Sequence, residues 1–300
     1  MTDQKHNSRS NKKTQRERIQ EISEQLEEGV RNIFESEQYK KWLSVCSRFH
    51  NYSLNNTILI TMQRPDASLV CGYARWKEFG RTVKKGEHGI RILAPYKYKT
   101  EIEDSNGDRQ TVEQIGFKPV YVFDVAQTEG KELPTIGVHE LTGDVKEYRR
   151  MFRALTKISP VPIRFEEIQS GGKGYYNDAE KCIALQSGMS QLQTIKTLVH
   201  EICHSQNHSR EALKERAGLD RRSMEVESES VAHIVLKTFN LDSEDYSIPY
   251  ISSWSSGKDI KELKACMESI RSTADEMITG INRSLDRQKK REQRDYDMER

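Results

Sequence analysis

Apolar residues recur at intervals of three and four along residues 16–60 of the chain. That period is typical of α-helices that bury one face, as in Ile22, Leu26 and Val30. We therefore predict three helices in this part, at about 16–34, 42–49 and 53–60. A polar, basic stretch without this period comes first, so residues 1–14 are expected to be a disordered arm.

The pattern changes at Arg64-Pro65-Asp66, because proline interrupts a helical period. The short β-branched and aromatic runs that follow predict strands at 68–73, 90–95, 96–100 and 117–124. A helical turn is expected at 74–80, and Asn106-Gly107 predicts the tip of a hairpin. This part of the chain is expected to form a compact unit with a small sheet.

A second group of elements follows a stretch with scattered glycine and proline at about 126–144. We predict a helix at 145–158 and then strands at 161–165, 171–176 and 182–185. Further helices are expected at 190–207, at 224–236 and from about 258. The charged run 286–300 is expected to leave the last helix and form a solvated tail.

These elements predict an α+β protein with two domains, and 300 residues are enough for each half to bury a core. The expected parts are a disordered basic arm at 1–14, a first domain at 15–130, a linker at 131–144, a second domain at 145–256, and a C-terminal helix with a charged tail at 257–300.

The segment 190–207 contains His200-Glu201-Ile202-Cys203-His204. On a helix the two histidines project from the same face one turn apart, which suits chelation of a metal ion. Glu201 lies about 100° round the helix, where it can reach water in the cleft but is badly placed to be a ligand. This His-Glu-x-x-His arrangement is that of zinc peptidases, in which the glutamate is the catalytic base. We therefore expect Zn²⁺ here.

A tetrahedral catalytic site needs a third protein ligand. The predicted helix 224–236 offers Glu225 and Glu229, which share one side, whereas Glu227 is expected to point elsewhere. We predict Glu225 as the ligand and Glu229 as a carboxylate that orients a ligand imidazole. The reverse assignment is the alternative.

Two further features would serve a peptidase. The run 183–185 is predicted to be an edge strand along which an extended peptide substrate can pair. A hydroxyl from Tyr246 or Tyr250 would help to stabilise a tetrahedral intermediate, with a purely packed tyrosine as the alternative.

Composition narrows the classes of protein. Charged residues make up 31% of the chain, no apolar run approaches the length of a membrane span, and the first residues lack a signal-peptide core. We expect a cytoplasmic protein with no membrane partner. Five scattered cysteines without a Cys-x-x-Cys pair argue against a disulfide framework and against a thiolate zinc site.

Positive charge is concentrated in the first half, where residues 40–100 hold twelve Lys or Arg and three acidic residues. Aromatic residues lie among them, and this mixture suits single-stranded DNA because cations neutralise phosphates while exposed rings stack on bases. Rings that belong to the core and lysines that only solvate the surface are the alternative. The candidate DNA-binding residues are Arg75, Trp76, Lys77, Arg81, Lys84, Lys85, Arg91, Lys97 and Lys99.

This half contains several distinctive motifs: Trp42, 53–60, 63–67, Gly72-Tyr73, Trp76, 80–90 and 92–95. Together they resemble the N-terminal domain of ArdC-type antirestriction proteins, which conjugative plasmids and related mobile elements encode. In that family the domain binds single-stranded DNA and precedes a zincin-like metallopeptidase domain. The resemblance covers most of 15–255. It implies zinc held by His200, His204 and a downstream acid, with Glu201 as the catalytic base.

Two functions follow as hypotheses. In the first, the protein binds single-stranded DNA during conjugation and its zincin-like domain, a small sheet with the active-site helix, hydrolyses a protein or peptide substrate. In the second, the protein protects transferred DNA by occupancy, and zinc is structural.

Overall fold

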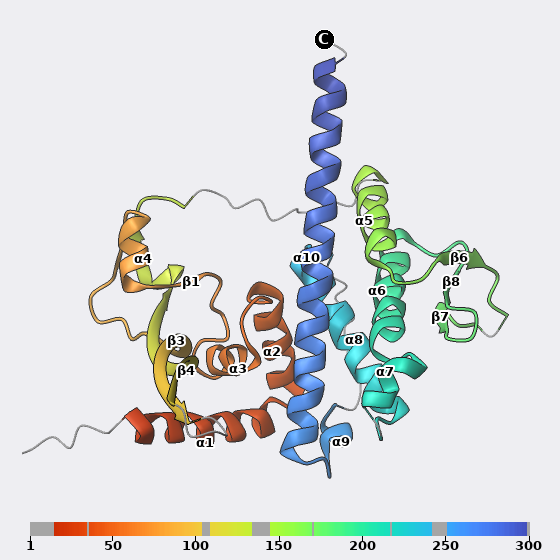
Figure 1. Ribbon diagram of the computed structural model, residues 1–300. Coiled ribbons are helices and arrows are strands. Elements are labelled where there is room, and N and C mark those ends of the chain that lie inside the picture. Colours follow the sequence, from red (N-terminus) through yellow and green to blue (C-terminus); the bar gives the residue numbers. More distant parts are fainter. Residues whose placement is uncertain are drawn as a thin grey trace, which may run out of the picture.

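The computed structural model describes residues 15–34, 36–103, 109–133, 145–169, 171–216, 218–241 and 251–298. These residues form a mixed α+β fold, as predicted, in which their strands make two three-stranded sheets and one two-stranded sheet (Figure 1). Within the described residues, no helix offers an apolar stretch of the length that a bilayer crossing requires.

The first half begins with three helices and continues with short strands around a long hairpin. The elements are α1 (Gln15–Ile33), α2 (Ser36–Arg48), α3 (Leu54–Gln63), β1 (Val70–Gly72), α4 (Tyr73–Glu78), β2 (Arg81–Val83), β3 (Ile90–Glu103), β4 (Arg109–Asp124), η1 (Val125–Gln127) and β5 (Thr128–Gly130). The predicted strands 90–95 and 96–100 are therefore one strand, β3, which pairs antiparallel with β4 along its whole length. Strand β1 pairs with the other edge of β4.

The second half places a small sheet beside a group of helices. The elements are α5 (Val145–Ile158), β6 (Ile163–Glu166), β7 (Gly174–Asn177), β8 (Cys182–Gln186), α6 (Gln191–Asn207), α7 (Arg210–Glu215), α8 (Arg221–Thr238), α9 (Ile251–Ser255) and α10 (Ile260–Met298). The helix predicted at 145–158 has the same bounds as α5, whereas α7 and α9 have no counterpart in the sequence-based prediction.

The prediction that 183–185 is an edge strand is wrong. These residues belong to β8, which is the central strand of the order β6-β8-β7 and pairs parallel with β6 and antiparallel with β7. Ile183, Ala184 and Leu185 are fully buried. Their continuous apolar run is the mark of a strand covered on both faces, and the edges of the described sheet are β6 and β7.

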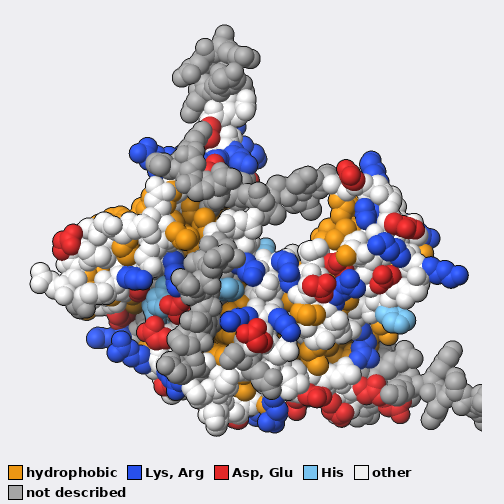
Figure 2. Space-filling model, turned by 180° about the vertical axis from the view of Figure 1, so that it is seen from behind, with side chains coloured by type: hydrophobic (Ala, Val, Ile, Leu, Met, Phe, Trp, Pro, Cys, Tyr) orange, Lys and Arg blue, Asp and Glu red, His pale blue; other side chains and the backbone are white. Residues whose placement is uncertain are grey.

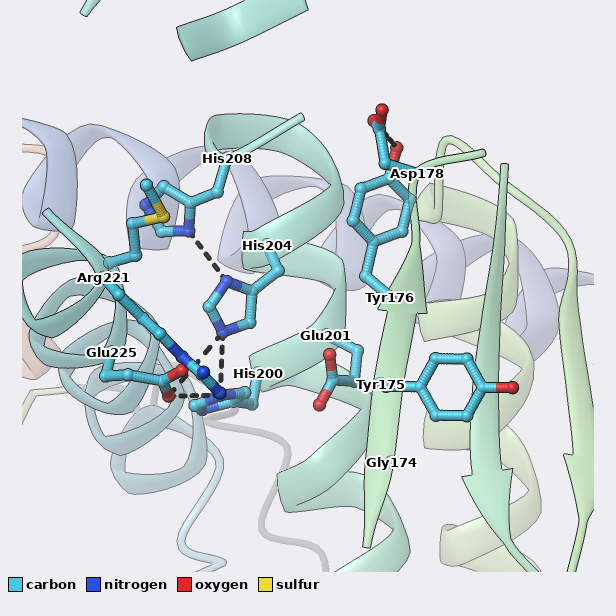
Figure 3. A pocket seen from close by; sticks show the side chains of 11 residues that line it. Gly174, Tyr175, Tyr176, Asp178, His200, Glu201, His204, His208, Arg221 and Glu225 are labelled. Atoms are coloured by element: carbon cyan, nitrogen blue, oxygen red, sulfur yellow. Dashed lines mark hydrogen bonds and ion pairs between the residues drawn. The ribbon is translucent and has the colours of Figure 1, made fainter. Parts of the chain in front are cut away.

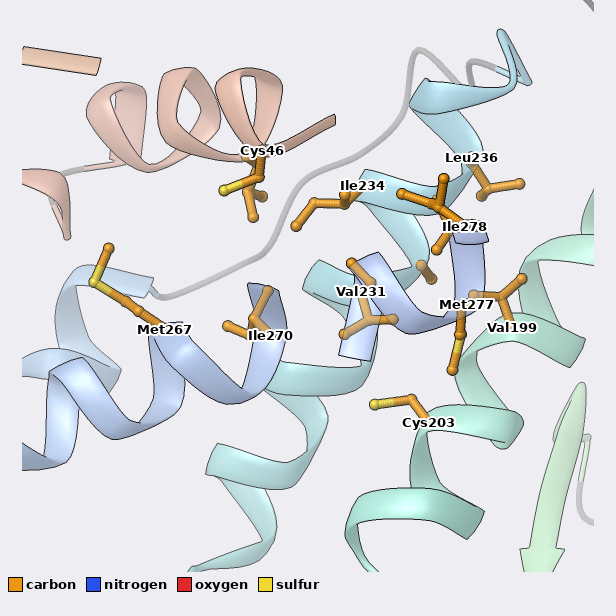
Figure 4. Packing of buried hydrophobic residues seen from close by; sticks show 14 of the residues in the cluster. Cys46, Val199, Cys203, Val231, Ile234, Leu236, Met267, Ile270, Met277 and Ile278 are labelled. Atoms are coloured by element: carbon orange, nitrogen blue, oxygen red, sulfur yellow. The ribbon is translucent and has the colours of Figure 1, made fainter. Parts of the chain in front are cut away.

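One buried apolar cluster joins helices from both halves of the chain. Its members include Trp42 of α2, Val199 of α6, Val231 of α8 and Ile270 of α10, the last three of which are seen in Figure 4. Helix α10 stands between the two halves (Figure 1). Helices α1–α3 thus share a core with α6, which carries the histidine pair, and with α8. The division into domains at 131–144 stays a prediction.

The prediction that the charged run 286–300 leaves the helix is wrong for its described part. Helix α10 continues as one helix to Met298, and its last turns extend beyond the body of the protein (Figure 1). Lys, Arg, Glu and Gln are good helix formers, and Asp286 and Lys290 have the spacing of a favourable ion pair. High charge therefore solvates this helix without ending it.

Candidate metal centre and its surroundings

Helix α6 presents the histidine pair because its other face is buried. The helix begins where the Ser190 side chain accepts a hydrogen bond from the Gln193 backbone N–H. Residues at helical spacing bury one side of it: Ile195, Leu198, Val199 and Ile202. His200 and His204 project from the opposite side toward α8 (Figure 3).

Helix α8 supplies the acidic side chains that face this pair. It is capped by Asp220, whose carboxylate accepts a hydrogen bond from the Ser223 backbone N–H at 2.7 Å. Its buried face includes Val226, Ser230, Val231, Ile234 and Val235. Glu225 and Glu229 lie one turn apart on the side toward α6.

Three potential ligand atoms converge between the two helices (Figure 3). The Nε2 atoms of His200 and His204 are 3.0 Å apart, and Glu225 Oε2 lies 3.4 Å and 3.8 Å from them, respectively. Tetrahedral zinc with bonds of about 2.0–2.1 Å separates its ligand atoms by about 3.3 Å. The three observed separations bracket that value, so this donor set fits a zinc ion.

The carboxylates of Glu225 and Glu229 lie near different nitrogens of the His200 ring. Glu225 approaches Nε2, the nitrogen that faces His204. Glu229 Oε1 lies 3.4 Å from Nδ1, and Glu229 Oε2 lies 3.6 Å from Lys196 Nζ. This geometry favours Glu225 as the ligand and Glu229 as the carboxylate behind it.

The site is electrostatically suited to a cation. Hydrogen bonds from His200 and His204 hold the pKa of Glu225 far below its usual range, so its carboxylate is charged. Burial acts to lower the pKa of His200, but the hydrogen bond to Glu225 and the nearby carboxylates outweigh burial and raise it. A bound cation would replace the protons that these groups now share.

Glu201 lies on the opposite side of the pair from Glu225, next to β7 (Figure 3). Its side chain is buried, with the residue 6% exposed, and accepts a hydrogen bond from the Tyr176 backbone N–H. Burial raises the pKa of Glu201, and the two histidines oppose this rise only in part. A carboxylate with a raised pKa is the type of group that acts as a general base near neutral pH.

The side chains of His200, Glu201, His204 and Glu225 line one pocket of about 560 Å³. Strand β7 forms one wall and α8 the other, with His200, Glu201 and His204 between them. Tyr246 and Tyr250, predicted as hydroxyl donors, lie outside the described residues. Arg221, at the start of α8, also lines the pocket and was not among the predicted site residues.

A buried polar network beneath the histidine pair is also absent from the sequence-based prediction. His208 Nδ1 lies 2.9 Å from His204 Nδ1, and His208 Nε2 lies 3.0 Å from Glu227 Oε2. Arg216 donates two hydrogen bonds to Glu227, at 2.9 Å and 2.5 Å. Burial lowers the pKa of His208 and acts to raise that of Glu227, but the bonds from Arg216 and His208 lower the Glu227 pKa overall. The sequence signal for this network is the spacing of four between His204 and His208.

The structure separates the candidate DNA-binding residues into several groups. Trp76 is 0% exposed and donates a hydrogen bond to the Phe123 carbonyl, so it belongs to the core and cannot stack on a base. Arg81 is also engaged internally, with hydrogen bonds to Thr128 and to the Lys131 carbonyl. The remaining candidates have exposed or partly exposed side chains: Arg75, Lys77, Lys84, Lys85, Arg91, Lys97 and Lys99.

Several of these exposed cations already contact neighbouring residues. Arg75 and Lys97 form ion pairs with Glu78 and Glu113, and Lys77 lies over the Tyr73 ring. Two more donate hydrogen bonds: Lys84 to the Ala126 carbonyl, and Arg91 to the Gln25 side chain. Figure 2 shows Lys and Arg on the half that holds the hairpin, with acidic and apolar side chains among them.

An exposed apolar row on β4 is a further feature that the sequence-based prediction lacks. Ile115, Phe117 and Tyr121 are 65%, 55% and 60% exposed. They are separated by even numbers of residues, and their side chains therefore share one face of the strand. Their antiparallel register partners on β3 include Lys97 opposite Ile115 and Arg91 opposite Tyr121, which places two cations beside the row.

Comparisons with known proteins bear on both halves. Residues 12–123 match the family model for the N-terminal domain of anti-restriction factor ArdC. The uncharacterised protein pXO2-81 of Bacillus anthracis is 24% identical over 330 aligned positions, which cover 95% of this chain and 55% of that protein. The chain thus spans about half the length of this curated relative.

Two solved structures of the antirestriction protein ArdC from plasmid R388 are also similar, each with 20% sequence identity. The metal-free structure has a TM-score of 0.49, over 79% of this chain and 86% of that one. The Mn(II)-bound structure has a TM-score of 0.47, over 78% and 85%.

Proposed function

We propose that this chain, whose residues 12–123 match the model for the N-terminal domain of ArdC, is a mobile-element antirestriction protein that binds single-stranded DNA and hydrolyses peptide bonds. In this proposal residues 145–256 are a zincin-like metallopeptidase domain that acts in the cytoplasm. DNA bound by the first half holds the peptidase near the proteins that attack or coat the incoming strand.

One observation carries the peptidase proposal. Glu201 and three convergent ligand atoms line the same pocket, with Glu201 on the strand side and Glu225 on the helix side of the histidine pair. His200, His204 and Glu225 would hold the ion. Bound zinc supplies a Lewis acid for water and for the scissile carbonyl. Glu201 accepts the proton of the attacking water and then returns it to the leaving amine.

The outer edge of β7, where the Tyr176 backbone N–H contacts Glu201, offers a place for an extended peptide. Strand β7 pairs with β8 on one side, and its other edge has no strand partner among the described residues. Tyr175 and Tyr176 of this strand line the pocket together with Glu201. A peptide paired with β7 by main-chain hydrogen bonds would therefore lie across the catalytic residues.

The test begins with the metal content of the purified full chain and of the His200→Ala variant by elemental analysis. About one zinc per chain is expected in the wild type and none in the variant. Cleavage of fluorescein-labelled casein, with and without single-stranded DNA, then tests the peptidase. Glu201→Gln should keep its zinc and lose cleavage, and a Glu201→Gln variant that still cleaves would rule out the mechanism.

The exposed row on β4 supports the DNA-binding half of the proposal. Phe117 and Tyr121 are free to stack on bases, while Arg91 and Lys97 beside them can neutralise phosphates. Each base stacked on an aromatic ring contributes about 1–3 kcal/mol. Phe117→Ala and Tyr121→Ala should therefore each weaken binding of a fluorescent oligothymidine by about 5- to 150-fold in anisotropy titrations.

Matched controls separate stacking from charge in this assay. Phe165→Ala removes a phenylalanine with 50% exposure from β6, away from the hairpin, and should leave DNA affinity unchanged. Lys85→Ala and Lys99→Ala should reduce the salt dependence of binding, because each removes a phosphate-neutralising charge. Equal affinity of the Phe117→Ala, Tyr121→Ala and wild-type proteins would exclude this row as the DNA-binding face.

A second candidate function is protection of DNA by occupancy, with zinc as a structural ion. The burial of His208 and Glu227 under the site favours it, because a buried network of this kind also stabilises a fold. In a plasmid-transfer assay, occupancy predicts full protection by Glu201→Gln, whereas the peptidase proposal predicts its loss.

A further inference from the structure

We propose that His208 is a positioning residue of the metal centre, which determines that His204 carries its proton on Nδ1 and offers the lone pair of Nε2 to the ion. This role rests on the proposed metal site but not on peptide hydrolysis. It assigns a purpose to the buried network formed by Arg216, Glu227 and His208, none of which lies among the proposed ligands.

The protonation states in the network follow from the carboxylate of Glu227, which is buried and ionised. The residue is 0% exposed, and its two oxygens accept hydrogen bonds from Arg216 at 2.9 Å and 2.5 Å and from the Ser269 hydroxyl at 2.9 Å. A bidentate pair with a guanidinium keeps this carboxylate ionised, and an ionised carboxylate only accepts hydrogen bonds. His208 Nε2, 3.0 Å away, must therefore carry a hydrogen and donate it.

A hydrogen bond between their Nδ1 atoms joins the imidazoles of His204 and His208. A neutral imidazole has one N–H and one bare nitrogen, so His208 with its hydrogen on Nε2 has a bare Nδ1. That Nδ1 lies 2.9 Å from His204 Nδ1, a distance at which one nitrogen must donate and the other accept. His204 therefore carries its hydrogen on Nδ1.

The consequence appears at the other end of the His204 ring. With Nδ1 protonated, Nε2 of neutral His204 is bare, and this is the atom 3.0 Å from His200 Nε2 and 3.8 Å from Glu225 Oε2. A metal ion binds an imidazole nitrogen only through such a lone pair. The network thus prepares His204 as a ligand before any ion arrives.

His208 is not itself placed to be a ligand. Its side chain is 2% exposed, and both of its nitrogens are engaged, one with His204 and the other with Glu227. It meets His204 at Nδ1, whereas the proposed ligand atoms meet at Nε2. In Figure 3 it lies beyond His204, on the side away from His200 and Glu225.

The first test needs neither metal nor substitution. Two-bond ¹H–¹⁵N correlation spectra of metal-free protein labelled with ¹⁵N-histidine report which ring nitrogen of each histidine carries the hydrogen. We expect the Nδ1–H form for His204 and the Nε2–H form for His208. An Nε2–H form for His204 in the wild-type protein would overturn the assignment.

The second test uses two substitutions that each keep half of the His208 contacts. His208→Asn keeps an oxygen near the Nδ1 position, which can accept from His204. His208→Gln places its amide near the Nε2 position, where it reaches Glu227 but not His204. We expect the zinc dissociation constant to rise by about 10- to 100-fold for His208→Gln, and by clearly less for His208→Asn.

His50→Gln is the matched control. His50 is another partly buried histidine, paired with Asp275 at 2.7 Å, and its loss should leave zinc affinity unchanged. Equal affinities for His208→Gln and the wild type would exclude the positioning role. Equal losses in His208→Gln and His208→Asn would mean that packing matters and the acceptor does not. A wild-type protein that binds no zinc would instead contradict the metal site itself.

Discussion

The Tyr39 hydroxyl of α2 lies 2.8 Å from the Ser230 hydroxyl of α8, which joins positions 191 residues apart. Ser230 donates its own hydrogen to the Val226 carbonyl, so Tyr39 is the donor in this pair. Burial raises the pKa of Tyr39 well above its usual range, which keeps that hydrogen in place. The contact ties the N-terminal helices to the helix that carries Glu225.

Replacement of Tyr39 by phenylalanine tests the contribution of this hydrogen bond to stability. Removal of one buried hydrogen bond should lower the free energy of unfolding by about 0.5–1.5 kcal/mol, measured by urea denaturation. Tyr98→Phe is the control, because the Tyr98 hydroxyl bonds Gln114 at an exposed position and contributes little. Equal stability of Tyr39→Phe and the wild type would show that the contact adds nothing.

Glu225 and Glu229 can be distinguished by zinc affinity. Glu225→Gln removes the carboxylate that faces both Nε2 atoms and should raise the zinc dissociation constant more than about 100-fold. Glu229→Gln removes the charge near His200 Nδ1 and Lys196 but leaves the ligand atoms in place, so a rise of about 10- to 100-fold is expected. Competition titrations with a chromogenic chelator measure both constants. The reverse order would assign Glu229 as the ligand.

The cap of α8 should respond to pH in a defined direction. The hydrogen bond from the Ser223 backbone N–H lowers the pKa of Asp220, with help from Lys258. Because the folded pKa lies below the unfolded value of about 3.9, the stabilisation is complete above about pH 5 and is lost as pH falls through the folded pKa.

Asp220→Asn keeps an oxygen acceptor at the cap but removes the charge. The difference in unfolding free energy between wild type and this variant should therefore be constant from pH 7 to about pH 5 and shrink at lower pH. Asp220→Ala, which removes the acceptor as well, should cost about 0.5–2 kcal/mol at neutral pH. A difference that does not change with pH would contradict the role of the charge.

Gly174 allows β7 to lie close to the site helix. A Cβ atom at this position would lie 2.6 Å from Thr197 Cγ2 of α6 and 3.0 Å from the Ala184 carbonyl oxygen of β8. Gly174→Ala should therefore displace β7 and destabilise the fold by about 1–3 kcal/mol in urea denaturation. Gly72→Ala is the control, since nothing lies within 4 Å of its added Cβ. Equal effects of the two substitutions would contradict this close approach.

The sequence by itself determined the elements whose causes are local. The bounds of α5 follow from its apolar period, and the placement of His200 and His204 on one face is a property of a single helix with their spacing. Glu201 is likewise positioned by its neighbours in the sequence. These features depend on residues within one or two turns of each other, so the pattern along the chain was sufficient to predict them.

Only the tertiary structure decided how distant segments meet. It made β8 the central strand, buried Trp76 beside Phe123, and placed Glu225 at Nε2 and Glu229 at Nδ1 of His200. It also brought Arg216, Glu227 and Ser269 together behind His208. Each of these contacts depends on how helices and strands pack against one another, and the periodicity of a single segment carries no information about the neighbour that will cover it.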